Sequence, residues 1–225
     1  MAIKIITDST CDIEYDMAEK IGIEIVPIGI NIDNKYYRDG IDISKNEFYE
    51  KLENSDSLPK TSQINPETFT EVFKKHINNG DTVLGMFISS KLSGTYQSAM
   101  IAKNLLESDD IYIIDPKNTT FGLALLLYEA VKMRDEGKNI FEICEKISNL
   151  IGRVRLLAVI TTLKYLKLGG RISTATAVVG GILGINPIIS VIDGEVKSIG
   201  KERGRKAGYK WIYEKIKNDM PDYNY

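Results

Sequence analysis

The sequence predicts an α/β protein with a parallel sheet, followed by a smaller α+β domain. Short apolar runs alternate with helical patterns through the first two thirds of the 225 residues. Strands that alternate with helices are typical of parallel βαβ units. From residue 153 the pattern changes to a double glycine, a long apolar stretch and a hairpin signal. We therefore expect an α/β domain over 1–152 and a second domain over 153–225.

The first elements follow from apolar runs and from helix caps. The sequence predicts a buried strand in "IKIIT", a helix in "IEYDMAEKIG" and one continuous strand in "IEIVPIGINI". Ser44 and Glu47 stand at capping-box spacing and predict the start of a helix in "SKNEFYEKLE". Asn65 as N-cap, Pro66 in the first turn and Gly80 at the end frame the helix "NPETFTEVFKKHINNG".

The alternation then continues regularly to the end of the first domain. The expected elements are strand "TVLGMFI", helix "SAMIAKNLLE", strand "IYIID", and helices "FGLALLLYEAVKMRDEG" and "IFEICEKISNLI". This order completes the repeated βα pattern of the first domain.

The second domain contains an apolar stretch over 175–192. It includes Pro187 and several polar residues, and a membrane span needs about 20 predominantly apolar residues. A buried helix that leads into a strand is therefore the better prediction. "VIDGEV" predicts a hairpin with Asp193 and Gly194 as its turn, and "GKERGRKAGYKWIYEKIKND" predicts a helix with a basic face.

Composition favours a soluble globular protein of a reducing compartment. Hydrophobic residues make up 43% of the chain and charged residues 27%, which is ordinary. The N-terminal "MAIKIITDST" turns polar too early for a signal peptide. Cys11 and Cys144 are too few and too far apart for a disulfide framework. We expect a cytoplasmic location.

Charge is distributed unevenly between the two predicted domains. Residues 1–152 carry 16 lysines and arginines against 25 acidic residues, whereas 153–225 carry 13 against 6. A basic domain can dock an acidic protein or bind nucleic acid. In the second case the phosphates would contact Lys201, Arg203, Arg205, Lys206 and Lys210. No recognised nucleic-acid motif accompanies these residues, so we expect no nucleic-acid partner.

Several kinds of enzyme are disfavoured by the residues that the chain lacks. His76 is the only histidine, and we expect it to be an exposed or half-buried helix residue. One histidine and two distant cysteines are too few for a structural zinc site. The chain has no G-x-S-x-G motif, no P-loop and no G-x-G-x-x-G motif. We expect no metal and no cofactor.

Three turns rich in hydroxyl side chains remain as the candidate site. They are "TDSTCD" (7–12), "KTSQINP" (60–66) and "SSKLSGTYQS" (89–98). Ligands of open α/β sheets collect at the carboxyl ends of the strands, and a helix N-terminus there suits an anion. Simple helix capping is the alternative, because Ser and Thr are preferred N-cap residues.

Five segments together resemble the DegV family of bacterial fatty-acid-binding proteins. They are "TDST", "KTSQINP", "SSKLSGTYQSA", "LKYLKLGGRIS" and "GILGINPIISVIDGEV", which occur in the family's order between Lys4 and about Arg205. The resemblance implies a two-domain α/β fold with a long-chain fatty acid between the domains. Family members usually run longer, with a late H-x-G-P-G-like segment. The second domain is therefore expected to be incomplete at its C-terminus and to lack a third head-group contact.

The resemblance also implies roles for particular residues. The carboxylate would be bound by Thr61, by Ser93 and by the backbone N–H of Gly94, with Ser62 and Thr95 beside them. Arg171, together with Lys167, would dock the catalytic subunit of a fatty acid kinase. That kinase would phosphorylate the bound fatty acid to an acyl phosphate for phospholipid synthesis. The chain would then be no enzyme, would have no membrane span and would touch a membrane surface only transiently.

An enzyme that uses the same hydroxyl-rich turns is the alternative. Asp8 and Asp115 both stand at predicted strand ends, where they could hold Mg²⁺ or act as bases of a phosphoryl transferase or hydrolase. The simpler role for both aspartates is to cap turns.

Overall fold

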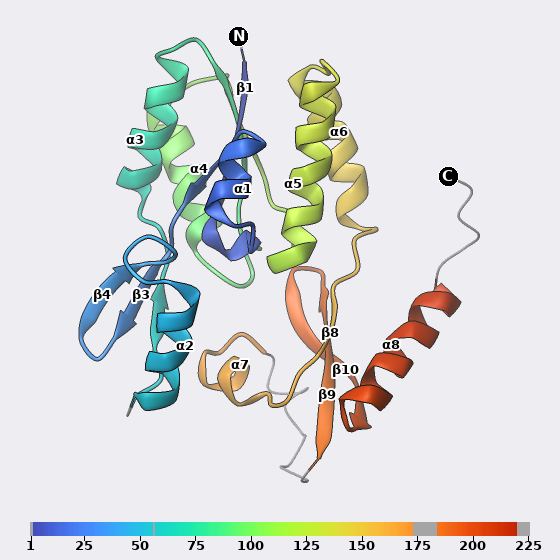
Figure 1. Ribbon diagram of the computed structural model, residues 1–225. Helices are drawn as coiled ribbons and strands as arrows, with labels where there is room; N and C mark the ends of the chain where they lie inside the picture. The colour runs from blue at the N-terminus through green and yellow to red at the C-terminus, as the bar shows by residue number, and fades with distance from the viewer. Residues whose placement is uncertain (1, 56, 173–183, 220–225) are drawn as a thin grey trace. The chain divides into compact units, whose positions relative to one another are not determined.

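The computed structural model describes residues 2–55, 57–172 and 184–219 (Figure 1). The chain divides into two compact units, Met1–Val154 and Arg155–Tyr225. The predicted α/β fold class is confirmed, since the first unit contains a parallel sheet flanked by helices.

The main sheet of the first unit has four parallel strands in the order β2-β1-β6-β7. These strands are β1 (Ile3–Asp8), β2 (Ile23–Val26), β6 (Thr82–Met86) and β7 (Ile111–Ile114). The two central strands, β1 and β6, are short and largely buried on both faces, and the buried residues of β1 include the polar Thr7 and Asp8 near its carboxyl end.

Helices cover both faces of this sheet (Figure 1). One face is covered by α1 (Tyr15–Lys20), α5 (Thr120–Asp135) and α6 (Ile140–Ile151). The other face is covered by α3 (Pro66–Ile77) and α4 (Thr95–Leu106). Ile5 points to the first core and Ile6 to the second, because successive side chains of a strand alternate between its faces.

The predicted helix caps are confirmed. In α2 (Lys45–Asn54), Glu47 N donates to Ser44 Oγ at 3.3 Å, and Ser44 N donates to Glu47 Oε2 at 2.9 Å. Asn65 Oδ1 accepts from Thr68 N at 2.8 Å, and Pro66 is the first residue of α3. Each cap satisfies backbone N–H groups that the first helical turn leaves without partners.

The prediction of one continuous strand in "IEIVPIGINI" is wrong. The segment forms β2 and then β3 (Gly29–Ile32), which belong to different sheets. Pro27 lies between them, and a proline cannot donate a hydrogen bond to a strand ladder. β3 pairs antiparallel with β4 (Lys35–Arg38) and with β5 (Lys60–Ser62), so the chain leaves the main sheet here.

The second unit contains an antiparallel sheet of three strands in the order β10-β9-β8. Its elements are β8 (Leu157–Val159), α7 (Lys164–Leu168), β9 (Ile185–Ile192), β10 (Glu195–Arg203) and α8 (Arg205–Asp219). The predicted hairpin is confirmed: Asp193 and Gly194 connect β9 to β10 with φ of 52° and 84°. Positive φ at both central residues is the signature of a type I′ turn.

The closing helix begins later than the sequence predicts. Residues from Gly200 to Arg203 belong to β10, where Lys201 pairs with Pro187 of β9. The helix α8 starts only after Gly204, whose φ is 83°. Pairing with β9 overrides the local helical pattern, because a strand partner satisfies the same backbone groups. The helix predicted ahead of β9, over 175–184, lies almost entirely outside the described residues.

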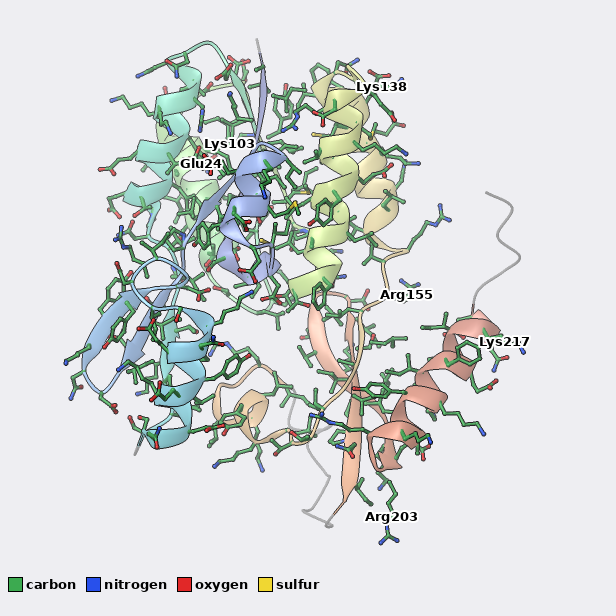
Figure 2. The ribbon with its side chains drawn as sticks, viewed as in Figure 1. Glu24, Lys103, Lys138, Arg155, Arg203 and Lys217 are labelled. Atoms are coloured by element: carbon green, nitrogen blue, oxygen red, sulfur yellow. The ribbon has the colours of Figure 1, made fainter. Side chains whose placement is uncertain are left out.

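His76 is buried, so its prediction as an exposed or half-buried residue is wrong. Its ring is turned inward from α3, and Nε2 lies 2.5 Å from Oε2 of Glu24 on β2. Figure 2 shows the position of Glu24 beside α3. The carboxylate partner explains how a polar ring can be buried at this place.

Membrane-spanning helices, metal-binding clusters and disulfides are all absent from the described residues. No helix within 2–55, 57–172 or 184–219 is long and apolar enough to cross a membrane. Across the same ranges, no three His, Cys, Asp or Glu side chains gather where they could hold a metal ion. Cys11 and Cys144 are both free thiols.

Candidate head-group site

The first hydroxyl-rich turn is organised by Asp8 at the end of β1. Its buried carboxylate accepts hydrogen bonds from Thr10 N at 2.9 Å, from Thr10 Oγ1 at 2.5 Å and from Ile88 N at 2.6 Å. The bond from Ile88 ties the carboxyl end of β1 to that of β6. Burial raises the pKa of Asp8 above its ordinary value, although these three donors act in the opposite direction.

Asp115 organises the turn that follows β7 in the same way. Its carboxylate accepts from Ser90 Oγ at 2.5 Å and from Lys117 N at 3.0 Å. Asp8 and Asp115 thus both cap turns, and their oxygens are engaged by neighbouring donors. The geometry gives no support to a metal-binding or basic role for these two carboxylates.

The third hydroxyl-rich turn leads directly into α4. Gly94 is the N-cap residue, and Ser93 supplies the hydroxyl: its Oγ accepts from Thr95 N at 3.3 Å and lies 3.0 Å from Thr95 Oγ1. Ser93 is half-buried, whereas Thr95 is fully buried. The N-terminus of α4, a helix of 12 residues, carries a partial positive charge, which favours an anion nearby.

The second hydroxyl-rich turn begins as β5 in the small antiparallel sheet. Thr61 pairs with Ile30 of β3 and has an exposed side chain. Ser62 pairs with Gly29, and its Oγ lies where a Cβ on that glycine would stand. Ser62 therefore serves the packing of the sheet, on the opposite side of the strand from Thr61.

Gln63 connects the second turn to the third. Its Nε2 donates to Ser98 Oγ, in α4, at 3.1 Å. Its Oε1 lies against Gly94, so closely that a Cβ added to this glycine would stand 1.9 Å away. The structure therefore brings "KTSQINP" and "SSKLSGTYQS" together, as a common site requires. Sequence reasoning missed this role of Gln63, although an amide two residues after the expected Thr61 could have indicated it.

The predicted docking residues lie at the end of α7 in the second unit. Lys167 and Arg171 are both exposed, and Arg171 follows the double glycine that ends the helix. The Arg171 guanidinium donates to the carbonyl of Gly169. Tyr165 and Leu168 on the same helix are 47% and 60% exposed. The short helix thus presents apolar and basic side chains together.

The five basic residues considered for nucleic acid are exposed on β10 and α8. Figure 2 shows two cations of this region, Arg203 at the end of β10 and Lys217 on α8, both directed away from the sheet.

A pocket of about 460 Å³ lies in the first unit, at the amino end of β1, where Ala2, Lys4 and Arg134 line it. It is therefore at the opposite end of β1 from Asp8 and the hydroxyl-rich turns.

Comparison with known families decides the relationship of the chain. Residues 2–225 match the family model described as an uncharacterised protein of the DegV family. The chain belongs to the DegV family. A DegV domain-containing protein of Caldanaerobacter subterraneus is 42% identical over 98% of this chain and 79% of that protein.

Solved structures of DegV proteins share the fold. A fatty-acid-binding DegV family protein of Thermus thermophilus is 30% identical with a TM-score of 0.89, over 97% of this chain and 78% of its own. A stearic-acid-binding protein of Eubacterium ventriosum is 33% identical with a TM-score of 0.89, over 97% of this chain and 76% of its own.

Proposed function

We propose that this DegV chain binds a long-chain fatty acid, with the carboxylate at Thr61, Ser93 and the backbone N–H of Gly94. The observation that carries the proposal is the hydrogen bond from Gln63 to Ser98, which joins the two turns that supply these groups. The fatty acids bound by the relatives from Thermus thermophilus and Eubacterium ventriosum support the same ligand class.

The chemistry of the two turns suits a carboxylate. Removing an anion from water costs several kcal/mol unless hydrogen bonds replace the lost hydration. Hydroxyl groups can donate these bonds, and the N-terminus of α4 adds a favourable dipole. Because both hydroxyls are neutral, the site would bind an anion without burying a competing charge.

The acyl chain would supply most of the affinity. At about 0.8 kcal/mol for each buried CH₂ group, a chain of about sixteen carbons gives on the order of 10 kcal/mol before costs. Ordering the chain and losing free motion remove a large part of this gain. The head-group hydrogen bonds would then select carboxylic acids from other lipids.

Mass spectrometry of the purified protein tests this proposal. We expect native spectra to show one adduct of fatty-acid mass, and organic extraction after denaturation to release the same acid in near one-to-one amount. Protein that shows no adduct is then incubated with stearic acid and measured again. A protein that contains no lipid and takes up no added stearic acid would contradict the proposal.

We further propose that the chain presents the bound acid to a partner kinase and is not itself the catalyst. The kinase would transfer the γ-phosphoryl group of ATP to a carboxylate oxygen, which yields an acyl phosphate and ADP. The exposed Lys167 and Arg171, next to the apolar Tyr165 and Leu168, support a docking surface on α7. Arginine and aromatic side chains are frequent anchors of protein interfaces.

Reversing the charge at this surface is expected to slow phosphoryl transfer without releasing the bound fatty acid. Arg171→Glu should lower the rate of acyl phosphate formation with a DegV-partner kinase by about tenfold or more. The change removes the arginine that would anchor the kinase and puts a charge of the opposite sign in its place. Hydroxylamine trapping of the acyl phosphate measures the rate. Lys217→Glu on α8 is the matched control, and equal losses in the two variants would refute a specific docking role for Arg171.

A further inference from the structure

We infer that Gln63 is the positioning residue of the head-group site: its amide holds the strand that carries Thr61 against the start of α4. The inference rests on the proposed function and identifies what fixes the geometry of that site. Thr61 and Ser93 are 32 residues apart and belong to differently built parts of the first unit. Something must therefore set the distance between their hydroxyls.

The backbone around Gln63 is fixed on both sides. Ser62 is paired with Gly29 in the small antiparallel sheet. Ile64 is buried in the core beside Phe69, on the face of the main sheet that α3 and α4 cover. Gln63 is the residue between these two attachments. Gln63 is exposed overall, but these two attachments place its amide at the first turn of α4, where Nε2 contacts Ser98.

Two contacts place the amide on that turn. Nε2 donates to the hydroxyl of Ser98, a residue that is buried in α4, and Oε1 lies against Gly94. The N–H of Ser98 donates to the carbonyl of Gly94 at 2.9 Å. One amide therefore contacts both ends of a single helical turn. Loss of this contact would remove one restraint on the turn that carries Gly94 and the adjacent Ser93.

The contact depends on an amide at position 63 and on the space that glycine leaves at position 94. A methionine has similar length but no donor for Ser98, and a glutamate would bring a negative charge next to a bound carboxylate. A Cβ at position 94 would stand 1.9 Å from Oε1, so the amide would have to move and would lose its present position on Ser98. The inference thus explains Gly94 by its neighbour as well as by its own N–H group.

Head-group discrimination in Gln63→Met and Ser98→Ala tests the inference. We expect both variants to bind hexadecanoic acid about three- to tenfold more weakly, the effect of one hydrogen bond. Binding of hexadecan-1-ol should stay unchanged, because it depends little on the carboxylate contacts. The double variant should lose no more than either single variant, since both changes remove the same bond. Asn54→Ala, which removes another side-chain amide that hydrogen-bonds locally, is the control.

Hydrogen exchange of the ligand-free protein gives an independent readout. In Gln63→Met, the amides of residues 93–98 should exchange faster than in the wild type, whereas those of β7 should not change. Equal affinity for the acid in wild type and variants, or equal weakening for acid and alcohol, would overturn the inference alone. A wild type that binds neither ligand would overturn the proposed function and this inference with it.

Discussion

Replacing Thr61 and Ser93 together by alanine is expected to weaken fatty-acid binding by about a hundred- to ten-thousandfold. Each hydroxyl would donate to a charged group, and such a bond contributes about 1.5–3 kcal/mol. Their joint loss therefore corresponds to about 3–6 kcal/mol, with about 1.4 kcal/mol for each factor of ten. The carboxylate would be left with the N–H of Gly94 and the dipole of α4, which cannot replace its hydration.

Titration of each variant with a fluorescent or radiolabelled fatty acid measures this loss. Each single variant should lose roughly half of the binding free energy that the double variant loses, because the two hydroxyls come from separate turns and their effects should add. Ser148→Ala is the matched control, since this exposed hydroxyl donates only to Cys144 O within α6. Full affinity in the double variant would show that the carboxylate binds elsewhere.

Replacing Asp8 by alanine is expected to cost the first unit about 3–5 kcal/mol of unfolding free energy at mildly acidic pH, a loss typical of a broken buried polar network. The change leaves the N–H groups of Thr10 and Ile88 without their acceptor at the buried junction of β1 and β6. Urea dependence of hydrogen exchange in the β1 and β6 peptides measures the loss for this unit.

Asp115→Ala is the matched control, because its carboxylate caps a similar turn in a half-buried position. We expect this change to cost about 1 kcal/mol of unfolding free energy.

The pH dependence of the unfolding free energy adds a second check on Asp8. Since burial raises the folded-state pKa of Asp8 above 3.8, the carboxyl stabilises most at pH below 3.8, and this contribution falls as pH rises through the folded-state pKa. The difference in unfolding free energy between wild type and Asp8→Ala should therefore shrink as the pH rises. A difference that grows with pH would contradict a raised pKa for Asp8.

Local chemistry made part of this fold predictable. The capping box of Ser44 and Glu47, the N-cap Asn65 and the Asp193-Gly194 turn depend on residues within one turn of each other. Their hydrogen bonds and dihedral angles are therefore encoded in short stretches of sequence. The family resemblance added the order of the motifs and the expected ligand class.

Contacts between distant segments could not be predicted in this way. His76 is buried because Glu24, 52 residues away, faces it. Gln63 and Ser98 are 35 residues apart, and long-range packing, including that of α3 on α4, brings them together. The prediction of one continuous strand in "IEIVPIGINI" failed because the effect of Pro27 depends on which sheet each half joins.

The close approach of Gln63 to Gly94 has an evolutionary consequence. An alanine at position 94 would push the amide from its place, and a shorter residue at position 63 would leave Ser98 without its donor. Either change alone would cost the hydrogen bond between Gln63 and Ser98, so a lineage that altered one residue would be freer to alter the other. In descendants of this chain the two residues should be inherited as a pair.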